Sequence, residues 1–307
     1  MRYYYIYIYI YMKITYGTKE CNINVTQICL DNLRTNNIIT IPSNDNKRAQ
    51  CFSDPIFKVL KMIFVTINNV TTEYDDLQTI QINLDTQEII SFNIDKKISE
   101  IHNQLKLNYG IFEHELPEQK MALRYLTGNE KILEIGGNIG RNSLIIAHIL
   151  GKNNNNLVTL ESDSSIADQL KENRDLNNFT FHIENSALSK RNLIQRGWDT
   201  MVSDILLPGY KNVDTITLDQ LHSKYNIEFD TLVLDCEGAF YYILMDMPEI
   251  LNNINLIIME NDYHDISHKN YIDIVLKDNQ FIVDYVECGG WGPCYNNFFE
   301  VWRRIQS

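Results

Sequence analysis

The chain has 307 residues, of which 44% are hydrophobic and 22% are charged. This composition is typical of a globular protein, so it excludes wholesale disorder, and the length predicts about two domains. The 27 Lys and Arg residues stand against 40 Asp and Glu residues, which gives a net charge of −13. An acidic chain without long basic runs is poorly suited to follow a phosphate backbone, so we expect no nucleic-acid partner.

The first segment is a low-complexity extension over residues 1–11, in which Tyr and Ile alternate. It lacks the small-residue cleavage site of a signal peptide. It is also about half as long as the roughly 20 residues of a membrane-spanning helix. We therefore predict no membrane span, a dispensable extension, and Met12 as an alternative start to Met1.

Residues 12–97 are predicted to form a β-rich accessory module. Alternating apolar and polar residues, many of them β-branched, indicate short strands separated by Pro and Asn-rich turns. A short helix is expected over residues 24–33. The expected strands cover residues 12–16, 38–41, 61–67, 79–84 and 88–93. No cluster of His, Cys or carboxylate residues assigns chemistry to this module.

Residues 98–307 show a different pattern, in which apolar strands alternate with helices. Such alternation predicts a doubly wound sheet whose ligand site lies at the carboxyl ends of its strands. The expected strands cover residues 131–135, 157–160, 179–183, 231–234, 256–259, 281–286 and 298–302. The expected helices cover residues 115–126, 142–150, 164–176, 239–247 and 269–277, and residues 188–226 are expected to cover the cleft.

The six cysteines include no C-x-x-C pair and no zinc-binding spacing. They are too few and too scattered for a disulfide framework, so we expect a reducing compartment and a cytoplasmic localisation.

A Gly-rich turn after the first strand of this domain predicts a cofactor site. Gly136, Gly137, Asn138 and Gly140 separate that strand from the next helix, whose free N–H groups suit an anionic group. Glu161 ends the following strand, where a carboxylate can accept both hydroxyls of a ribose. The glycine spacing differs from the G-x-G-x-x-G of nicotinamide sites. S-adenosylmethionine is therefore favoured over a nicotinamide cofactor, while a tight turn without a ligand is the structural alternative.

The acidic residue that precedes this turn also fits S-adenosylmethionine. Glu134 stands two residues before the first glycine, where it could receive the ammonium group of the cofactor directly or through water.

Residues 110–302 resemble the FkbM family of S-adenosylmethionine-dependent methyltransferases. The matching segments are residues 134–140, Glu161, and residues 185–188, 217–219, 234–239 and 258–260. The resemblance implies a Rossmann-like seven-stranded methyltransferase sheet and methyl transfer to an oxygen, often a sugar hydroxyl. It also implies cofactor contacts at the glycines of the turn, Asn138 and Glu161, and near Ser186 and Ala187. The chain departs from the family at Gly137, Ser162 and Phe240, and we expect Ser162 also to contact the cofactor.

Deprotonation of a hydroxyl needs a base or a metal ion. Asp235 ends one core strand, and Glu260 and Asn261 end the next. These three residues could supply oxygen ligands to Mg²⁺ or a similar divalent cation, as in catechol-type O-methyltransferases. Capping and turn roles are the structural alternatives. His264 is the preferred candidate base among the nearby histidines, ahead of His268.

Substrate contacts are predicted around the same cleft. Glu237 follows the Asp235 strand, and Trp291 lies in a Gly-rich loop where its ring could stack on a sugar. Trp198, Arg191 and Arg196 lie in the segment expected to cover the cleft, and the two arginines could contact a nucleotide-sugar diphosphate.

These observations predict an O-methyltransferase that acts on a sugar hydroxyl of a glycan or nucleotide sugar. Two alternatives remain open from the sequence: methylation of another small hydroxylated molecule, and a non-catalytic glycan-binding protein on a degenerate methyltransferase fold. The acceptor and the oligomeric state are left unassigned.

Overall fold

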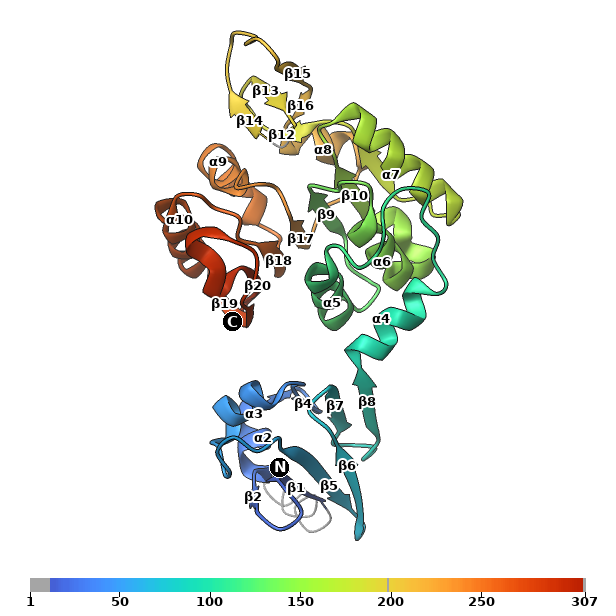
Figure 1. Ribbon diagram of the computed structural model, residues 1–307, viewed down its shortest axis with the longest axis vertical. Coiled ribbons are helices and arrows are strands. Elements are labelled where there is room, and N and C mark those ends of the chain that lie inside the picture. The colour runs from blue at the N-terminus through green and yellow to red at the C-terminus, as the bar shows by residue number, and fades with distance from the viewer. Residues whose placement is uncertain (1–11, 198, 306–307) are drawn as a thin grey trace. The chain divides into compact units, whose positions relative to one another are not determined.

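The computed structural model describes residues 12–197 and 199–305 and divides into two compact units, with the boundary between Glu100 and Ile101 (Figure 1). The Tyr/Ile extension over residues 1–11, and with it the choice of start, lies outside the described residues. In the described part of the chain, no helix has the length and apolar character needed to cross a membrane.

The N-terminal unit is β-rich, as predicted, and consists of two four-stranded antiparallel sheets. One sheet contains β2 (Asn22–Asn24), β1 (Met12–Gly17), β5 (Met62–Ile67) and β6 (Val70–Tyr74), in that order. The other contains β3 (Arg34–Thr35), β4 (Ile38–Ile41), β7 (Gln78–Asn83) and β8 (Ile89–Asn93). Alternate apolar residues such as Ile14, Ile39, Ile63 and Ile80 meet in one buried core.

Among the described residues, α2 (Thr26–Asn32) and α3 (Asp45–Phe52) lie in this unit, and α4 (Ile94–His102) crosses the boundary to the second unit. The expected helix over residues 24–33 corresponds to α2, whereas α3 has no apolar period that could predict it. Its buried residues are Arg48 and Phe52. The guanidinium group of Arg48 donates to the carbonyl oxygens of Pro42 at 2.8 Å and Gln78 at 2.7 Å, so a polar residue anchors this helix.

The second unit contains a seven-stranded sheet in the order β11-β10-β9-β17-β18-β20-β19, which confirms the predicted Rossmann-like methyltransferase fold. The strands are β9 (Ile132–Ile135), β10 (Leu157–Leu160), β11 (His182–Glu184), β17 (Thr231–Leu234), β18 (Leu256–Glu260), β19 (Phe281–Glu287) and β20 (Phe299–Arg304). β20 runs antiparallel to both of its neighbours. Every residue of β9, β10 and β17 is buried, as expected for parallel strands covered on both faces.

The helices of this unit are α5 (Leu116–Tyr125), α6 (Arg141–Leu150), α7 (Ser164–Leu176), α8 (Leu218–Tyr225), α9 (Phe240–Asp246) and α10 (Ile266–Asp278). α5 packs against α6, and α9 packs against α10. The strand expected over residues 179–183 corresponds to β11, which begins only at His182. The chain after α7 first makes a turn, in which the Phe179 N–H donates to the Arg174 carbonyl oxygen at 3.3 Å.

The connection between β11 and α8 forms a small inserted sheet. β12 (Ala187–Leu188) pairs with β16 (Thr215–Ile216) at its base. Between these two strands, β13 (Leu193–Arg196) lies between β14 (Asp199–Val202) and β15 (Lys211–Val213) in antiparallel pairing. The three strands β13, β14 and β15 are called the inserted sheet below, and Figure 1 shows the loop from β14 to β15 rising away from the rest of this unit.

Glu134 lies inside the packing between β9 and α6. Its carboxylate accepts hydrogen bonds from the Ser143 hydroxyl at 2.5 Å and from the Asn142 side-chain amide at 3.4 Å. Only 2% of the residue is exposed, and this burial raises the pKa of its carboxyl group to about 7, although the bond from Ser143 opposes the shift. Glu134 therefore connects α6 to the central sheet, and its burial favours the protonated form of its carboxyl group.

We predict that Glu134→Gln removes a pH-dependent loss of stability. Because the pKa is raised in the folded state, the stabilising contribution is fully present below the ordinary pKa of 4.5 and is lost as the pH rises through about 7. The free energy of unfolding of the variant minus that of the native chain should therefore increase by about 2 to 3 kcal/mol from pH 5 to pH 8. Denaturant unfolding of the ligand-free proteins at both pH values measures this change.

Glu130→Gln is the matched control. Bonds from Thr127 and neighbouring N–H groups lower the pKa of the Glu130 carboxyl, so its titration falls outside this pH range. The difference between this variant and the native chain should not change from pH 5 to pH 8. If the difference between Glu134→Gln and the native chain also stays constant from pH 5 to pH 8, the raised pKa of Glu134 is contradicted.

Candidate functional site

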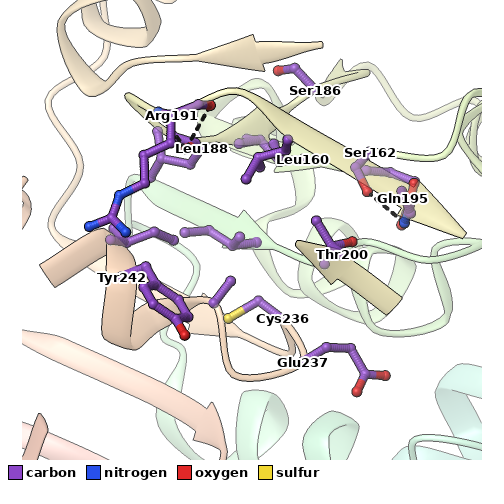
Figure 2. Close-up of a pocket in the computed structure, with 18 of the residues that line it drawn as sticks. Leu160, Ser162, Ser186, Leu188, Arg191, Gln195, Thr200, Cys236, Glu237 and Tyr242 are labelled. Atoms are coloured by element: carbon purple, nitrogen blue, oxygen red, sulfur yellow. Dashed lines mark hydrogen bonds between the residues drawn. The ribbon is translucent and has the colours of Figure 1, made fainter. Parts of the chain in front are cut away.

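A cavity of about 550 Å³ lies at the carboxyl ends of β9, β10 and β17. Figure 2 shows residues that line it, among them Leu160, Ser162 and Leu188 together with Gln195 and Thr200 of the inserted sheet. Cys236 and Glu237 after β17 and Tyr242 of α9 form another part of the wall. Its size is that of a pocket for a cofactor or another small molecule.

The predicted Gly-rich turn forms the edge of this cavity at Gly136. Gly136 has a φ of +91°, and a Cβ at this position would lie 1.5 Å from the backbone oxygen of Asp235. Only glycine fits here. The N–H groups of Gly136 and Gly137 donate to the Leu160 carbonyl oxygen at 3.1 and 2.9 Å, which fixes the turn between the ends of β9 and β10.

The other two glycines of the turn have packing roles. A Cβ on Gly137 would lie 2.4 Å from the Thr159 hydroxyl oxygen, and one on Gly140 would lie 2.3 Å from Leu170. Both glycines were predicted as cofactor contacts. In the described part of the chain, Gly136 and Asn138 line the cavity, whereas Gly137 and Gly140 do not.

Glu161 lies in the cavity wall with its carboxylate held by the backbone. One oxygen accepts from the Asn138 N–H at 2.9 Å, and the other accepts from the Asp163 N–H at 2.8 Å. The Asn138 side chain in turn donates to Glu115 at 3.0 Å. Burial raises the pKa of the Glu161 carboxyl, and the two N–H bonds oppose that rise. The carboxylate is therefore oriented, with acceptor capacity left for ligand hydroxyls.

Ser162, Gln195 and Ser186 add further polar groups to the cavity wall. Ser162 accepts a hydrogen bond from the Gln195 side-chain nitrogen at 3.2 Å (Figure 2). Within the described residues, the Gln195 side-chain oxygen and the Ser186 hydroxyl are buried without a hydrogen-bond partner. Ala187 lies next to Ser186 in the wall. A buried polar atom without a partner is costly, so these atoms are available to a polar ligand.

Three acidic side chains converge beside the cavity. Asp235 follows β17, Glu260 ends β18, and Glu118 projects from α5, so that one carboxylate oxygen of each lies within 4.8 Å of the others. Burial, a hydrogen bond to Glu118 and the charge of Asp235 raise the pKa of Glu260 to about 11. Burial and the surrounding carboxylates also raise the pKa of Asp235 well above its usual range. This acid cluster therefore holds protons or requires a cation.

Further carboxylates surround the acid cluster. Glu115 forms an ion pair with Arg141 at 2.5 Å, and the Asp262 carboxylate accepts from the Gly238 N–H at 2.8 Å. Burial and the neighbouring Glu237 raise the pKa of Asp262 to about 7. Glu237 itself is exposed, lines the cavity and has a φ of +50°. The negative potential of these groups suits a cationic ligand.

Two predicted residues, Asn261 and Glu134, are almost fully buried. The side-chain nitrogen of Asn261 donates to the Asn297 carbonyl oxygen at 2.6 Å, and within the described residues its side-chain oxygen has no hydrogen-bond partner. The third side chain of the acid cluster is Glu118. The carboxylate of Glu134 is directed to Ser143, as described above, and within the described residues it does not line the cavity.

His264, His268 and Trp291 were predicted to lie at the cleft. His264 is exposed and contacts the Trp291 ring at a tilt of 44°, with 4.4 Å between ring centroids. His268 stacks on Tyr241 at 3.8 Å. In the described part of the chain, none of these side chains lines the cavity. Trp198 lies outside the described residues.

The two predicted arginines differ in environment. Arg191 lines the cavity, where its guanidinium group binds both carboxylate oxygens of Asp246 at 2.5 and 2.7 Å and covers the Tyr242 ring. This pair joins the inserted sheet to α9. Arg196 is exposed and lies over the Tyr210 ring at 4.7 Å.

Glu118 and Gln195 are the site residues that sequence analysis missed. Glu118 lies on the same face of α5 as Met121 and Ala122, so a carboxylate interrupts an apolar helix face. That interruption is a signal that could have identified it. Gln195 carries no motif, because its position depends on how the inserted sheet folds back over β10.

No protein-family model matches the chain, and no curated protein matches it. Solved structures to which it is similar include an O-methyltransferase from Bacillus cereus in complex with SAH, at 15% identity and a TM-score of 0.39, over 69% of this chain and 91% of that one. A ribosomal protein L11 methylase from Lactobacillus delbrueckii subsp. bulgaricus is similar at 13% identity and a TM-score of 0.39, over 65% and 82% of the two chains. The m1A22 tRNA methyltransferase TrmK from B. subtilis is similar at 11% identity and a TM-score of 0.39, over 61% of this chain and 65% of that one. The likeness is one of fold.

Proposed function

We propose that the chain is an S-adenosylmethionine-dependent O-methyltransferase. The observation that carries the proposal is the Glu161 carboxylate, which two backbone N–H groups hold in the cavity wall close to Gly136. A fixed acceptor at this position suits the two ribose hydroxyls of an adenosine. The motifs shared with the FkbM family support the same proposal.

The residues of the cavity fit this cofactor. The apolar side chains of Leu160 and Leu188 would pack on the adenine ring, and the unpartnered Ser186 hydroxyl and Gln195 oxygen would meet its polar edge. Gly136 would allow the amino-acid part to approach the backbone. The acid cluster would favour the positive charges of the ammonium and sulfonium groups.

The proposed chemistry is methyl transfer to an oxygen. The bound cofactor would supply an electrophilic methyl group, which passes from sulfur to the acceptor oxygen as the sulfonium becomes a neutral thioether. Asp235 would accept the hydroxyl proton, because it lines the cavity at the end of β17. Burial and the surrounding carboxylates raise its pKa, which makes the ionised carboxylate more basic. His264 remains a candidate base if the acceptor lies nearer the mouth.

The proposed acceptor is a sugar hydroxyl of a glycan or nucleotide sugar. Glu237 is exposed at the cavity and could accept hydrogen bonds from neighbouring hydroxyls. The exposed Trp291 ring offers a stacking surface nearby, beside His264. Another small hydroxylated acceptor, or a glycan-binding protein without activity, would use the same groups differently, and labelled-methyl transfer to a panel of sugars separates these cases.

We predict that Glu161→Gln weakens S-adenosylmethionine binding by about 10- to 100-fold. The amide cannot accept from both backbone N–H groups and also hold the ribose, so charge-assisted hydrogen bonds are lost. Calorimetry measures the change. Glu172→Gln, which alters an exposed acid on α7, is the control and should bind as the native chain does. Failure of the native protein to bind the cofactor at millimolar concentration would refute the proposed function.

Asp235→Asn should lower the rate constant of methyl transfer by about 10²- to 10⁴-fold and leave cofactor affinity nearly unchanged. The substitution keeps the shape of the side chain and removes its basicity. Single-turnover rates with saturating cofactor measure the chemical step. Asp278→Asn, at the exposed end of α10, is the control, and equal rates for both variants would exclude Asp235 as the base.

The acid cluster supports a second proposal within the same function, a divalent cation. Glu118, Asp235 and Glu260 would supply three carboxylate oxygens, the ligand type preferred by Mg²⁺. The ion would neutralise the cluster and lower the pKa of an acceptor hydroxyl bound to it. Asn261, the ligand predicted from sequence, donates from its side-chain nitrogen to Asn297, and within the described residues its side-chain oxygen has no hydrogen-bond partner.

If the cation is required, EDTA should reduce turnover to background, and excess Mg²⁺ should restore it. Glu118→Gln should then raise the Mg²⁺ concentration that gives half-maximal turnover by about tenfold or more, because one anionic ligand is lost. Glu113→Gln, an exposed change in the same region, should leave that concentration unchanged. Turnover that persists in EDTA would reject the cation and leave proton transfer to Asp235.

A further inference from the structure

The end of β14 and the loop that connects it to β15 expose a group of apolar side chains. They are Met201, Val202, Ile205, Leu206 and Leu207, called the apolar strip below. Ile205 is 72% exposed and Leu206 is 53% exposed. Exposed apolar residues in sequence are unfavourable in water unless they serve an interaction.

The loop is held in shape by its own hydrogen bonds. The Ser203 N–H donates to the Asn192 carbonyl oxygen at 3.0 Å, and the Ile205 N–H donates to the Ser203 hydroxyl oxygen at 3.1 Å. The Asn192 side chain donates to Asp204 at 3.0 Å. The apolar side chains are therefore presented by an ordered turn, which Figure 1 shows extending away from the second unit.

One end of the apolar strip belongs to the candidate active site. Met201 and Val202 line the cavity, next to Thr200 (Figure 2), whereas Ile205 and Leu206 lie further along the loop. A surface that met the loop would therefore be close to the cavity. A molecule anchored in that surface could extend its polar part into the cavity.

The charge of this region differs from that of the chain as a whole. The segment from 189 to 213 carries Lys190, Arg191, Arg196 and Lys211 against Asp199 and Asp204, in a chain with a net charge of −13. Three of the basic side chains form ion pairs with acids of neighbouring elements, at Glu249, Asp246 and Asp163. Arg196 is exposed over Tyr210, with Asp199 4.0 Å away. Arg196 is therefore the basic side chain of this segment that is placed to meet phosphates, because acids of neighbouring elements hold the other three.

We propose that the apolar strip docks on a phospholipid bilayer and that the acceptor is a lipid-linked hydroxyl compound presented from it. Ile205 and Leu206 would enter the boundary between headgroups and acyl chains, with Arg196 at the phosphates. A second copy of the chain fits less well, because a stable protein interface takes about 20–30 residues on each side, whereas the apolar strip has five. The docking stands by itself, and the acceptor class rests on the proposed function.

Vesicle co-sedimentation tests the docking. The full chain should sediment with phosphatidylcholine vesicles that contain phosphatidylglycerol, and the double variant Ile205→Asn/Leu206→Asn should bind about tenfold more weakly or worse, since two apolar side chains no longer enter the bilayer. Ile274→Asn removes an equally large side chain, 60% exposed on α10, and should bind like the native chain. Circular dichroism and cofactor affinity verify that the double variant is folded.

The opposite results are equally specific. Absence of vesicle binding by the native chain, or equal binding by the double variant, would overturn the docking. A concentration-dependent dimer that the double variant loses would assign the apolar strip to self-association and would also overturn it.

Activity measurements separate the acceptor class from the proposed function. With vesicles present, a lipid-linked sugar should be methylated with a kcat/KM at least about tenfold above that of the same sugar without the lipid, and the double variant should lose this advantage but keep its rate on the soluble sugar. Equal values for both acceptors would refute the lipid-linked class. Vesicle binding without any methyl transfer would refute the proposed function and leave the docking intact.

Discussion

The close approach of Gly136 to the backbone of Asp235 is the constraint on which the candidate site depends. A side chain at Gly136 would come within 1.5 Å of the Asp235 carbonyl oxygen. The Asp235 N–H donates to the Ile135 carbonyl oxygen at 3.0 Å, so the ends of β9 and β17 are joined where the two strands stop. The same contact brings the proposed base next to the turn that would hold the cofactor. Larger residues at Gly136 would separate the two.

The carboxylates near this contact fall into two environments. Glu161 is buried but receives two backbone N–H groups, which favour its ionised form. Glu260 lies against Glu118 and Asp235, and burial together with these two acids raises its pKa to about 11. One site can thus combine a fixed anion for hydroxyl recognition with a group of acids able to hold a proton or a cation. Several carboxylates therefore gather where a cationic cofactor would bind.

The parts predicted from sequence are those that local pattern determines. Buried apolar runs predicted the central strands, and the carboxyl-end rule predicted that Glu161 and Asp235 meet the Gly-rich turn. Side-chain direction was harder to predict. Glu260 and Asn261 are adjacent, and adjacent side chains in an extended chain point to opposite sides. Glu260 lies in the acid cluster, whereas the side-chain nitrogen of Asn261 donates to Asn297. Glu118 was missed because its position depends on the packing of α5, far from Asp235 in the sequence.

The inserted sheet and the central sheet obey different constraints. Strands such as β9 and β17 are buried on both faces, so their sequence is set by packing. β14 is exposed along its whole length, and its Thr200, Met201 and Val202 line the cavity, so packing in the core does not explain its Met201 and Val202. Residues that packing leaves unexplained are those free to respond to a ligand or surface. The chemistry that we propose for the central sheet is general to hydroxyl acceptors, and the inserted sheet is therefore the element that would select among them.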